Sequence, residues 1–319
     1  MTENLTGLPA VVPLDGLPPA VTIYEVGPRD GLQNEQLTIP TETKADLIAR
    51  LLGAGLAPVE ATSFVHPKWV PQLADAAELE RMLADRLGDA ARGLPVLVPN
   101  ERGLDRALEL GLTHVAIFGS ATETFANKNL NQTYDGQFAM FEPVVSRAKA
   151  AGLTVRAYVS MCFGDPWEGR VPIDQVVTAG TRLLDLGADQ LSLGDTIGVG
   201  TAGHVTALVA AYADAGVPVD RLALHFHDTY GQALANTLAG LRAGVTTYDA
   251  SAGGLGGCPY AKSATGNLAT EDLVWMLDGL GIEHGVDLTK LVETSAWLAR
   301  ETGRPSPSAV VRALAPTRD

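Results

Sequence analysis

The stretch VVTAGTRLLDLGADQLSL, from Val176 to Leu193, contains the unit that is repeated along this chain. In residues 176–186 the apolar side chains recur at the spacing of a helix that buries one face. Gly187 comes next, and glycine suits the position just past a helix because it adopts the left-handed conformation without steric cost. Residues 190–193 then form a short β-rich run. The stretch predicts a helix whose end leads directly into a strand.

The same succession of helix, glycine and strand recurs from one end of the chain to the other. The glycines that end the other helical segments are Gly55, Gly93, Gly111, Gly152, Gly216 and Gly244. The β-rich runs after them are residues 57–61, 94–98, 113–118, 154–160, 222–227 and 245–250. Helical spacing is visible in residues 44–52, 76–83, 104–110 and 205–213. An opening run at 21–26 brings the number of predicted strands to eight.

Strands that alternate with helices pair in parallel through right-handed crossovers. Eight such units favour a closed (β/α)8 barrel, the TIM-barrel architecture, over the alternative of an open doubly wound sheet. Two further helical stretches, 271–280 and 289–300, close and extend the barrel. We therefore predict an α/β chain with a loose N-terminal arm at 1–19, a catalytic barrel at 20–280 and a C-terminal helical extension at 281–319 that packs on the barrel.

The amino-acid composition limits the classes of partner that the chain is expected to bind. Its 319 residues are 46% hydrophobic, enough for a large core, and 23 basic against 37 acidic residues give a net charge of -14. We expect neither nucleic acid nor an anionic membrane as partner, because so acidic a chain binds polyanions poorly. The only cysteines, Cys162 and Cys258, are too few for a disulfide framework. No run of ~18 apolar residues predicts a membrane helix, and residues 1–19 resemble no targeting segment, so a cytosolic protein is expected.

Residues with polar or reactive side chains gather at the carboxyl ends of the predicted strands, where a barrel of this kind builds its active site. Residues that served only the structure would be scattered over both ends of the barrel. The candidates, in chain order, are Arg29, Asp30, Glu60, Ser160, Asp195, His225, His227, Cys258 and Asn267. Their common position predicts one site at one face of the barrel.

The sharpest local signal is His225-Phe226-His227. Because a strand has a period of two, both imidazoles point to one side while Phe226 faces the helices. A lone histidine is more often a satisfied hydrogen-bonding group than a ligand, but the paired spacing reverses that preference. With oxygen ligands from Asp30 and the amide of Asn267, and no need for a thiolate, the expected ion is Mg²⁺ or Mn²⁺ rather than structural zinc.

The other candidates each have a structural alternative. Arg29 beside Asp30 is a solvated loop ion pair or a positioned pair, and the surrounding glycines and proline favour the second interpretation. Asp195 ends a predicted strand, which on position alone makes a structural and a functional role equally plausible. Cys258 follows a run of glycines that gives a backbone room to approach a ligand and to move. It is therefore predicted to act as an acid, base or nucleophile rather than to pack as a small apolar residue.

Taken together, these motifs resemble the 3-hydroxy-3-methylglutaryl-CoA lyase family. The resemblance covers nearly everything after the N-terminal arm, and the glycine-rich loop before Cys258 is its most specific part. The matching segments are VGPRDGLQNE (26–35), SFV (63–65), PKWVPQ (67–72), SLGDTIGVG (192–200), HDTYGQALANT (227–237), GLGGCPYA (254–261) and GNLATEDL (266–273). A departure is the segment SMCFGDPWEG (160–169), which in relatives is often smaller and less aromatic. At the end of a strand it is placed to reshape the pocket around the acyl group.

The resemblance implies a site as well as a fold. It implies that Asp30, His225, His227 and Asn267 bind a divalent cation. It implies that Arg29, Glu60, Asp195 and Cys258 are catalytic or orient the site. It also implies that Glu271 supports the residues that surround the metal. A homodimer acting on a CoA thioester, with a role in leucine degradation and ketone-body formation, is expected on the same basis.

The reaction that the resemblance implies is a retro-Claisen cleavage to acetyl-CoA and acetoacetate. Asp30 would take the proton of the C3 hydroxyl, Arg29 would stabilise the enolate oxygen, and Cys258 would protonate the departing carbanion. Three alternatives stay open: a lyase for another 3-hydroxyacyl-CoA, a synthase that condenses acetyl-CoA with a 2-oxoacid, and a barrel that only binds metal or CoA. Synthases of this superfamily usually carry a longer C-terminal region and lack the cysteine loop.

Overall fold

The computed structural model describes residues 7–35, 37–257 and 266–315. Eight parallel strands form one sheet in the order β1-β8-β7-β6-β5-β4-β3-β2. A bridge between Glu25 and Val59 joins the end of β1 to the chain just before β2, so the sheet closes on itself. The closed ring confirms the predicted barrel and excludes the doubly wound sheet. The strands are β1 (Thr22–Glu25), β2 (Thr62–Ser63), β3 (Val96–Leu97), β4 (His114–Ser120), β5 (Thr154–Ser160), β6 (Gln190–Asp195), β7 (Leu222–Phe226) and β8 (Thr247–Ala250).

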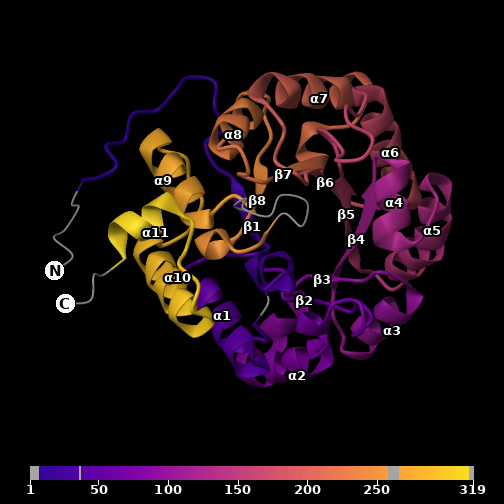
Figure 1. The fold of residues 1–319 in the computed structure, drawn as a ribbon, viewed down its shortest axis with the longest axis horizontal. Coiled ribbons are helices and arrows are strands. Elements are labelled where there is room, and N and C mark those ends of the chain that lie inside the picture. Colours follow the sequence, from indigo (N-terminus) through magenta and orange to yellow (C-terminus); the bar gives the residue numbers. More distant parts are fainter. Residues whose placement is uncertain (1–6, 36, 258–265, 316–319) are drawn as a thin grey trace.

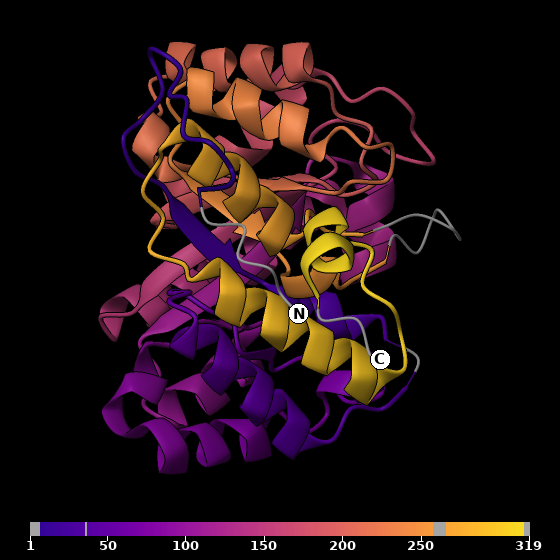
Figure 2. The same ribbon diagram turned by 90° about the vertical axis from the view of Figure 1, so that its left-hand side faces the viewer.

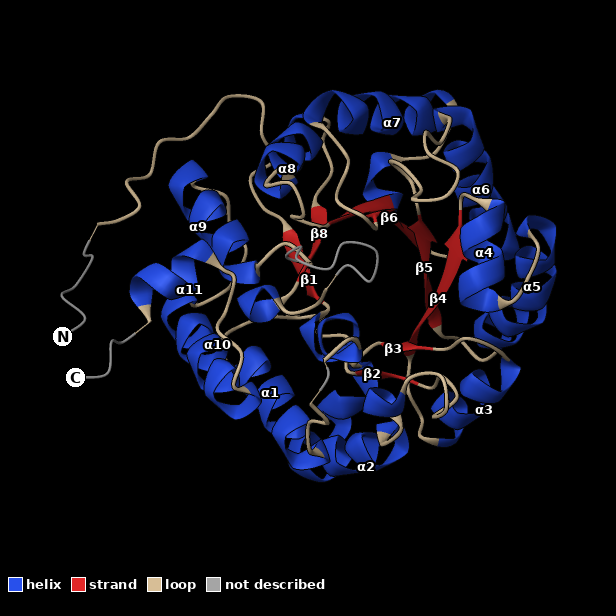
Figure 3. Ribbon diagram, viewed as in Figure 1, coloured by secondary structure: helices blue, strands red, loops and turns tan. Residues whose placement is uncertain are grey.

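Helices surround the strands on all sides (Figures 1 and 3). They are α1 (Thr41–Gly53), α2 (Ala76–Leu87), α3 (Glu101–Glu109), α4 (Glu123–Leu130), α5 (Tyr134–Ala150), α6 (Ile173–Leu186), α7 (Ala202–Asp214), α8 (Ala233–Arg242), α9 (Thr270–Leu280), α10 (Leu288–Thr302) and α11 (Ala309–Leu314). A π-helical turn at Gly27–Gly31 follows β1, and a 3-10 turn at Ala252–Gly254 follows β8. Within the described residues, no helix is long and apolar enough to cross a membrane.

The unit of helix, glycine and strand recurs as predicted, with two departures. Gly187 has φ 114°, and five of the other six predicted glycines also have positive φ. Gly93 does not: α2 continues to Leu87, and Gly88, with φ 61°, is the residue that follows it. The strand predicted at 57–61 is also displaced. β2 covers only Thr62–Ser63, although the residues before it also bond to the neighbouring strands: the amide of Glu60 donates to the carbonyl of Glu25 at 2.8 Å, and that of Ala61 to the carbonyl of Pro95 at 2.9 Å.

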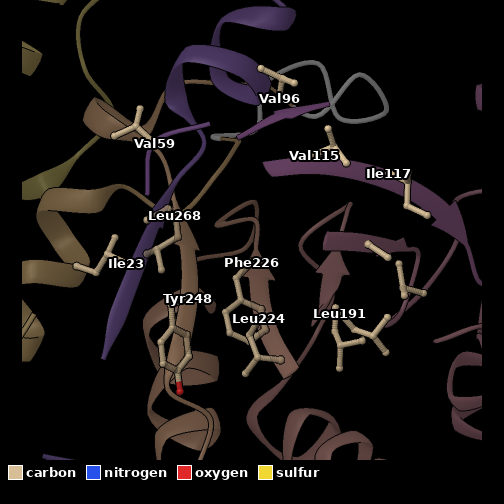
Figure 4. Close-up of a cluster of buried hydrophobic side chains, with 14 of the residues drawn as sticks. Ile23, Val59, Val96, Val115, Ile117, Leu191, Leu224, Phe226, Tyr248 and Leu268 are labelled. Carbon is tan, nitrogen blue, oxygen red and sulfur yellow. The ribbon is translucent and has the colours of Figure 1, made fainter. Parts of the chain in front are cut away.

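The strands turn apolar side chains outward to the helices, and several of their inward positions carry polar or charged side chains. In β7 and β8, Leu224 and Tyr248 face α8, where Gly240 leaves them room: a Cβ added there would lie 2.5 Å from Leu224 and 2.9 Å from the Tyr248 hydroxyl. These residues belong to the main apolar core, which fills the space between strands and helices (Figure 4). The alternating positions, such as Arg156 and Asp249, are buried and bond to each other across the barrel. The barrel interior is therefore charged as well as packed.

The last two helices pack against the side of the barrel where β1 and β8 meet (Figures 1 and 2). The guanidinium carbon of Arg50 in α1 lies 4.5 Å from the centre of the Trp297 ring in α10. The N-terminal segment is also attached, since the amide of Val12 donates to the carbonyl of Gly279 at 2.9 Å. The division into arm, barrel and extension at residues 19 and 280 stays a prediction.

Candidate active site

A cavity of about 400 Å³ opens at the carboxyl ends of the strands. Most of the barrel contributes to its wall, because each strand or the loop after it delivers a side chain to the same opening. From β1 to β7 these are Arg29, Asp30, Ser63, Leu97, Phe118, Tyr158, Ser160, Thr196, His225 and His227, with Trp69, Phe125 and Lys128 farther along the chain. The structure thus brings together five of the predicted site residues, Arg29, Asp30, Ser160, His225 and His227, in one cavity.

Three of these residues form a cluster suited to a cation. One ligand atom each from Asp30, His225 and His227 lies within 4.8 Å of the others. The two imidazole centres are 5.3 Å apart, whereas Phe226 between them packs against Phe163 in the outer core with ring centres 6.1 Å apart. The period of the strand therefore places both imidazoles on the inner face, as the sequence predicted.

Unsatisfied polar atoms show that the cluster fits a divalent ion. The amide nitrogen of Asn267 donates to Asp30 Oδ2 at 2.9 Å and to the carbonyl of Leu255 at 3.1 Å. Within the described residues, its oxygen is buried without a partner, as is Nδ1 of His227. Buried polar atoms are rarely left unpaired, and these two are a carbonyl-type oxygen and an imidazole nitrogen beside a carboxylate. Such a donor set suits Mg²⁺ or Mn²⁺.

The electrostatics of the cluster keep its ligands in the protonation states that bind a cation. Burial raises the pKa of Asp30, but the charge of Arg29, followed by the two histidines, lowers it to about 2. Burial, and then repulsion from His225, lowers the pKa of His227 to about 4. At neutral pH the site therefore presents an ionised carboxylate beside a neutral imidazole.

Arg29 is held in place from two sides. Its Nη1 lies 2.7 Å from Asp30 Oδ1, and its Nε donates to the carboxylate of Glu60. The hydroxyl of Tyr158 donates to the other oxygen of Glu60, and the Tyr158 ring lies beneath the guanidinium, 5.1 Å away. Arg29 is only 6% exposed and Glu60 is fully buried. The arginine is thus a fixed positive centre at the cavity wall, with Glu60 as its anchor.

A second buried group lies deeper in the barrel, and sequence reasoning missed it. Asp249 in β8 contacts Arg156 of β5, Ser192 of β6 and His225 of β7. Burial raises the pKa of Asp249, but the charge of Arg156 and the hydrogen bond with His225 hold it below its ordinary value. A signal was available, since Arg156 and Tyr158 stand two apart in a predicted strand and Asp249 is a charged residue inside another.

Two of the remaining candidates support loops. Asp195, whose pKa burial raises to about 6, accepts hydrogen bonds from the amides of Val199 and Gly200, both at 2.9 Å. Glu271, whose pKa burial raises to about 8, accepts from the amide of Gly253 at 2.9 and 3.0 Å and from the hydroxyl of Ser295. Their carboxylates therefore brace the loops after β6 and β8.

Cys258 lies outside the described residues, which end at Gly257 on that side of the gap. Of the aromatic segment 160–169, Ser160 lines the cavity. Trp167 packs instead against Phe125, with ring centres 6.4 Å apart, and carries Lys128 over its face at 4.9 Å. Trp167 therefore contacts two side chains of α4, Phe125 and Lys128, that line the cavity.

Known proteins share both the sequence and the fold. The sequence model of the HMGL-like family matches residues 20–298. The chain is 50% identical over 299 residues to the mitochondrial hydroxymethylglutaryl-CoA lyase of Arabidopsis thaliana, covering 94% of this chain and 63% of that protein. It is 49% identical to the cytoplasmic 3-hydroxy-3-methylglutaryl-CoA lyase of Danio rerio, covering 94% and 88%. A crystal structure of hydroxymethylglutaryl-CoA lyase from Pseudomonas aeruginosa superposes with a TM-score of 0.89 at 45% identity, covering 94% and 98%.

Proposed function

The chain belongs to the HMGL-like family, and on this premise we propose that it cleaves 3-hydroxy-3-methylglutaryl-CoA to acetyl-CoA and acetoacetate. The observation that carries the proposal is the cluster of Asp30, His225 and His227 beside the fixed Arg29 at the mouth of the barrel. A C2–C3 bond can break only if the C3 hydroxyl loses its proton and the thioester enolate is stabilised. The cavity offers one group for each need.

The first need is to bind and deprotonate the C3 hydroxyl. Asp30, His225, His227 and the amide oxygen of Asn267 would hold Mg²⁺ or Mn²⁺, which when bound would supply the Lewis acidity that makes the C3 hydroxyl more acidic. Asp30 is the base nearest that position. With a pKa of about 2 it is ionised but weakly basic, so it accepts a proton only from a hydroxyl that has already become acidic.

The second need is to stabilise the negative charge that develops on the thioester oxygen. Arg29 is positioned for this because Glu60 and Asp30 fix its guanidinium while the Tyr158 ring supports one face. A donor that is already oriented costs no reorganisation when the charge appears. Glu60 is thus assigned the role of orienting Arg29 rather than of touching the substrate.

The carbanion must finally be protonated, and we assign this step to Cys258. The loop that carries it begins beside the cavity, since Gly257 contributes to the wall. A thiol is a far stronger acid than a hydroxyl, which suits it to this step. Asp195 and Glu271 are assigned to the loops that they brace, and Glu271 acts on the cation site through that loop.

The alternatives are less well supported. The relatives reported above are named lyases for hydroxymethylglutaryl-CoA, which disfavours both a synthase and a lyase for another acyl group. A purely binding barrel would have no use for an oriented arginine. The finer expectations, a homodimer, a cytosolic location and a role in leucine degradation and ketone-body formation, stay predictions. Relatives named mitochondrial and cytoplasmic match this chain at nearly equal identity.

A panel of CoA thioesters tests the substrate. Purified protein is stripped of metal, supplied with Mg²⁺ or Mn²⁺, and given 3-hydroxy-3-methylglutaryl-CoA, its homologues with a longer or shorter C3 substituent, and acetyl-CoA with a 2-oxoacid. We expect acetyl-CoA release from the first compound above all others, and none with excess chelator. Preference for a homologue, or condensation in the reverse sense, would replace the proposal with one of the alternatives.

A further inference from the structure

Asp249 lies one layer below the proposed cation site and touches one of its ligands. Tyr248 packs outward against Gly240 of α8, so the period of the strand turns Asp249 into the barrel. Its Oδ2 lies 3.2 Å from Nδ1 of His225 and accepts a hydrogen bond from the hydroxyl of Ser192 at 2.7 Å. Its Oδ1 accepts from Nη2 of Arg156 at 2.6 Å. The side chain of Asp249 is 0% exposed, so water supplies little of its hydrogen bonding.

The contact with Arg156 fixes which atom carries the proton between Asp249 and His225. A guanidinium stays charged in proteins and only donates, so the carboxylate beside it is ionised and only accepts. Nδ1 of His225 must then be the donor in the 3.2 Å contact. In the neutral ring the other nitrogen, Nε2, is left with its lone pair free, and this is the atom available to a cation.

We propose that Asp249 is a positioning residue that holds His225 in the Nδ1–H tautomer, with Nε2 directed to the cation, and that Arg156 keeps Asp249 ionised for this purpose. The inference rests on the proposed cation site and adds to it a residue that contacts one of the cation's ligands. Imidazoles that bind metals commonly donate their other N–H to a carboxylate, which fixes both ring orientation and tautomer. His227 differs, because its Nδ1 has no partner within the described residues. Asp249 therefore orients one of the two imidazoles and not the other.

Asp249→Asn is the variant that separates positioning from packing, because it keeps the shape and removes the obligatory acceptor. Its amide can donate to Nδ1, which would move the ring proton to Nε2 and block the binding nitrogen. In metal-free protein with ¹⁵N-labelled histidine, we expect the long-range ¹H–¹⁵N spectrum of wild type to show a protonated Nδ1 on His225. The variant should show a protonated Nε2. Mn²⁺ titrated alone into the metal-free proteins should bind the variant roughly 10–100-fold more weakly.

A second variant serves as the control for loss of folding. Asp249→Asn leaves Arg156 buried at 5% exposure without its counter-charge, so Arg156→Met is combined with it to remove both charges together. Methionine keeps an apolar stem against Tyr24, whose ring centre lies 3.8 Å from the guanidinium. The double variant should regain stability but still bind Mn²⁺ weakly. Recovery of wild-type Mn²⁺ affinity in it would show that Asp249 serves only to neutralise Arg156.

His227→Ala distinguishes failure of this inference from failure of the cation site. If His227→Ala loses Mn²⁺ while Asp249→Asn binds it within threefold of wild type, the site stands and the positioning role is wrong. An Nε2–H tautomer of His225 in wild type would overturn the role as well. If wild type itself bound no Mn²⁺, both the cation site and the inference would fall together.

Discussion

Replacing Arg29 with glutamine tests the site most severely, because the structure assigns this side chain two separable contributions. Its guanidinium bonds to two carboxylates and is almost fully buried, with 7% of its side chain exposed against 0% for that of Glu60. Removing one partner of a buried ion pair costs about 3–5 kcal/mol of stability because the other charge is left uncompensated. Removing a donor to a developing oxyanion lowers kcat about 10²–10³-fold, or about 2.7–4 kcal/mol in the barrier.

The two contributions are separated by adding Glu60→Gln to Arg29→Gln. The double variant contains no uncompensated charge at Glu60, so we expect urea unfolding to return most of the stability that the single variant loses. Its kcat should stay about 10²–10³-fold below wild type with KM little changed, because the enolate stabiliser is still missing. A folded Arg29→Gln protein with wild-type kcat and only a raised KM would refute the role and make Arg29 a binding residue.

Four other variants test further parts of the account. His227→Ala should bind Mn²⁺ far more weakly and lose nearly all turnover; full activity in chelator-containing, metal-free buffer would contradict this. Cys258→Ser should fold and bind normally but lose most of its kcat, whereas Cys162→Ser should retain both turnover and sensitivity to alkylation, because Cys162 is fully buried and burial raises its thiol pKa. Glu80 is 2% exposed, neither of its oxygens has a hydrogen-bond partner in the part of the chain that the structure describes, and burial raises its pKa from 4.5 to about 8. A raised carboxyl pKa means that the folded chain disfavours the ionised form, so wild type should lose stability relative to Glu80→Gln as pH rises from 4.5 towards 8. The gap should reach about 3 kcal/mol near pH 7 and vanish below pH 4.5, and a pH-independent gap in urea unfolding would contradict it.

The fold was largely predictable because its unit is local. A helix, a glycine of positive φ and a strand follow one another within about twenty residues. Each unit can therefore be recognised from a short stretch of sequence. It failed at Gly93, since a 3-10 turn lies between the helix end at Leu87 and the next strand. It also failed to predict α4 and α11, and it gave no bounds for α5 and α8, the helices that end just before Gly152 and Gly244.

A site residue could be predicted only where a distinctive side chain also lies at a distinctive position in the sequence pattern. His225 and His227 stand out because two imidazoles two apart on a strand have few structural uses. Asp249 did not, although it is a charge inside a strand, because its partners Arg156 and Ser192 come from strands distant in sequence. Contacts across the barrel interior depend on register between strands, which local pattern does not encode. The same holds for the anchoring of Arg29 by Glu60, where 31 residues separate the partners.

The most direct test of the central claim is product analysis of the cleavage in D2O. Metal-loaded protein is given 3-hydroxy-3-methylglutaryl-CoA, and the products of early turnover are separated and weighed by mass spectrometry. A retro-Claisen cleavage forms an acetyl-CoA carbanion that takes its proton from an exchangeable donor. We therefore predict one deuterium in the acetyl group of each acetyl-CoA, with equimolar acetoacetate. Acetyl-CoA without deuterium, or no carbon–carbon cleavage of this substrate, would contradict the account.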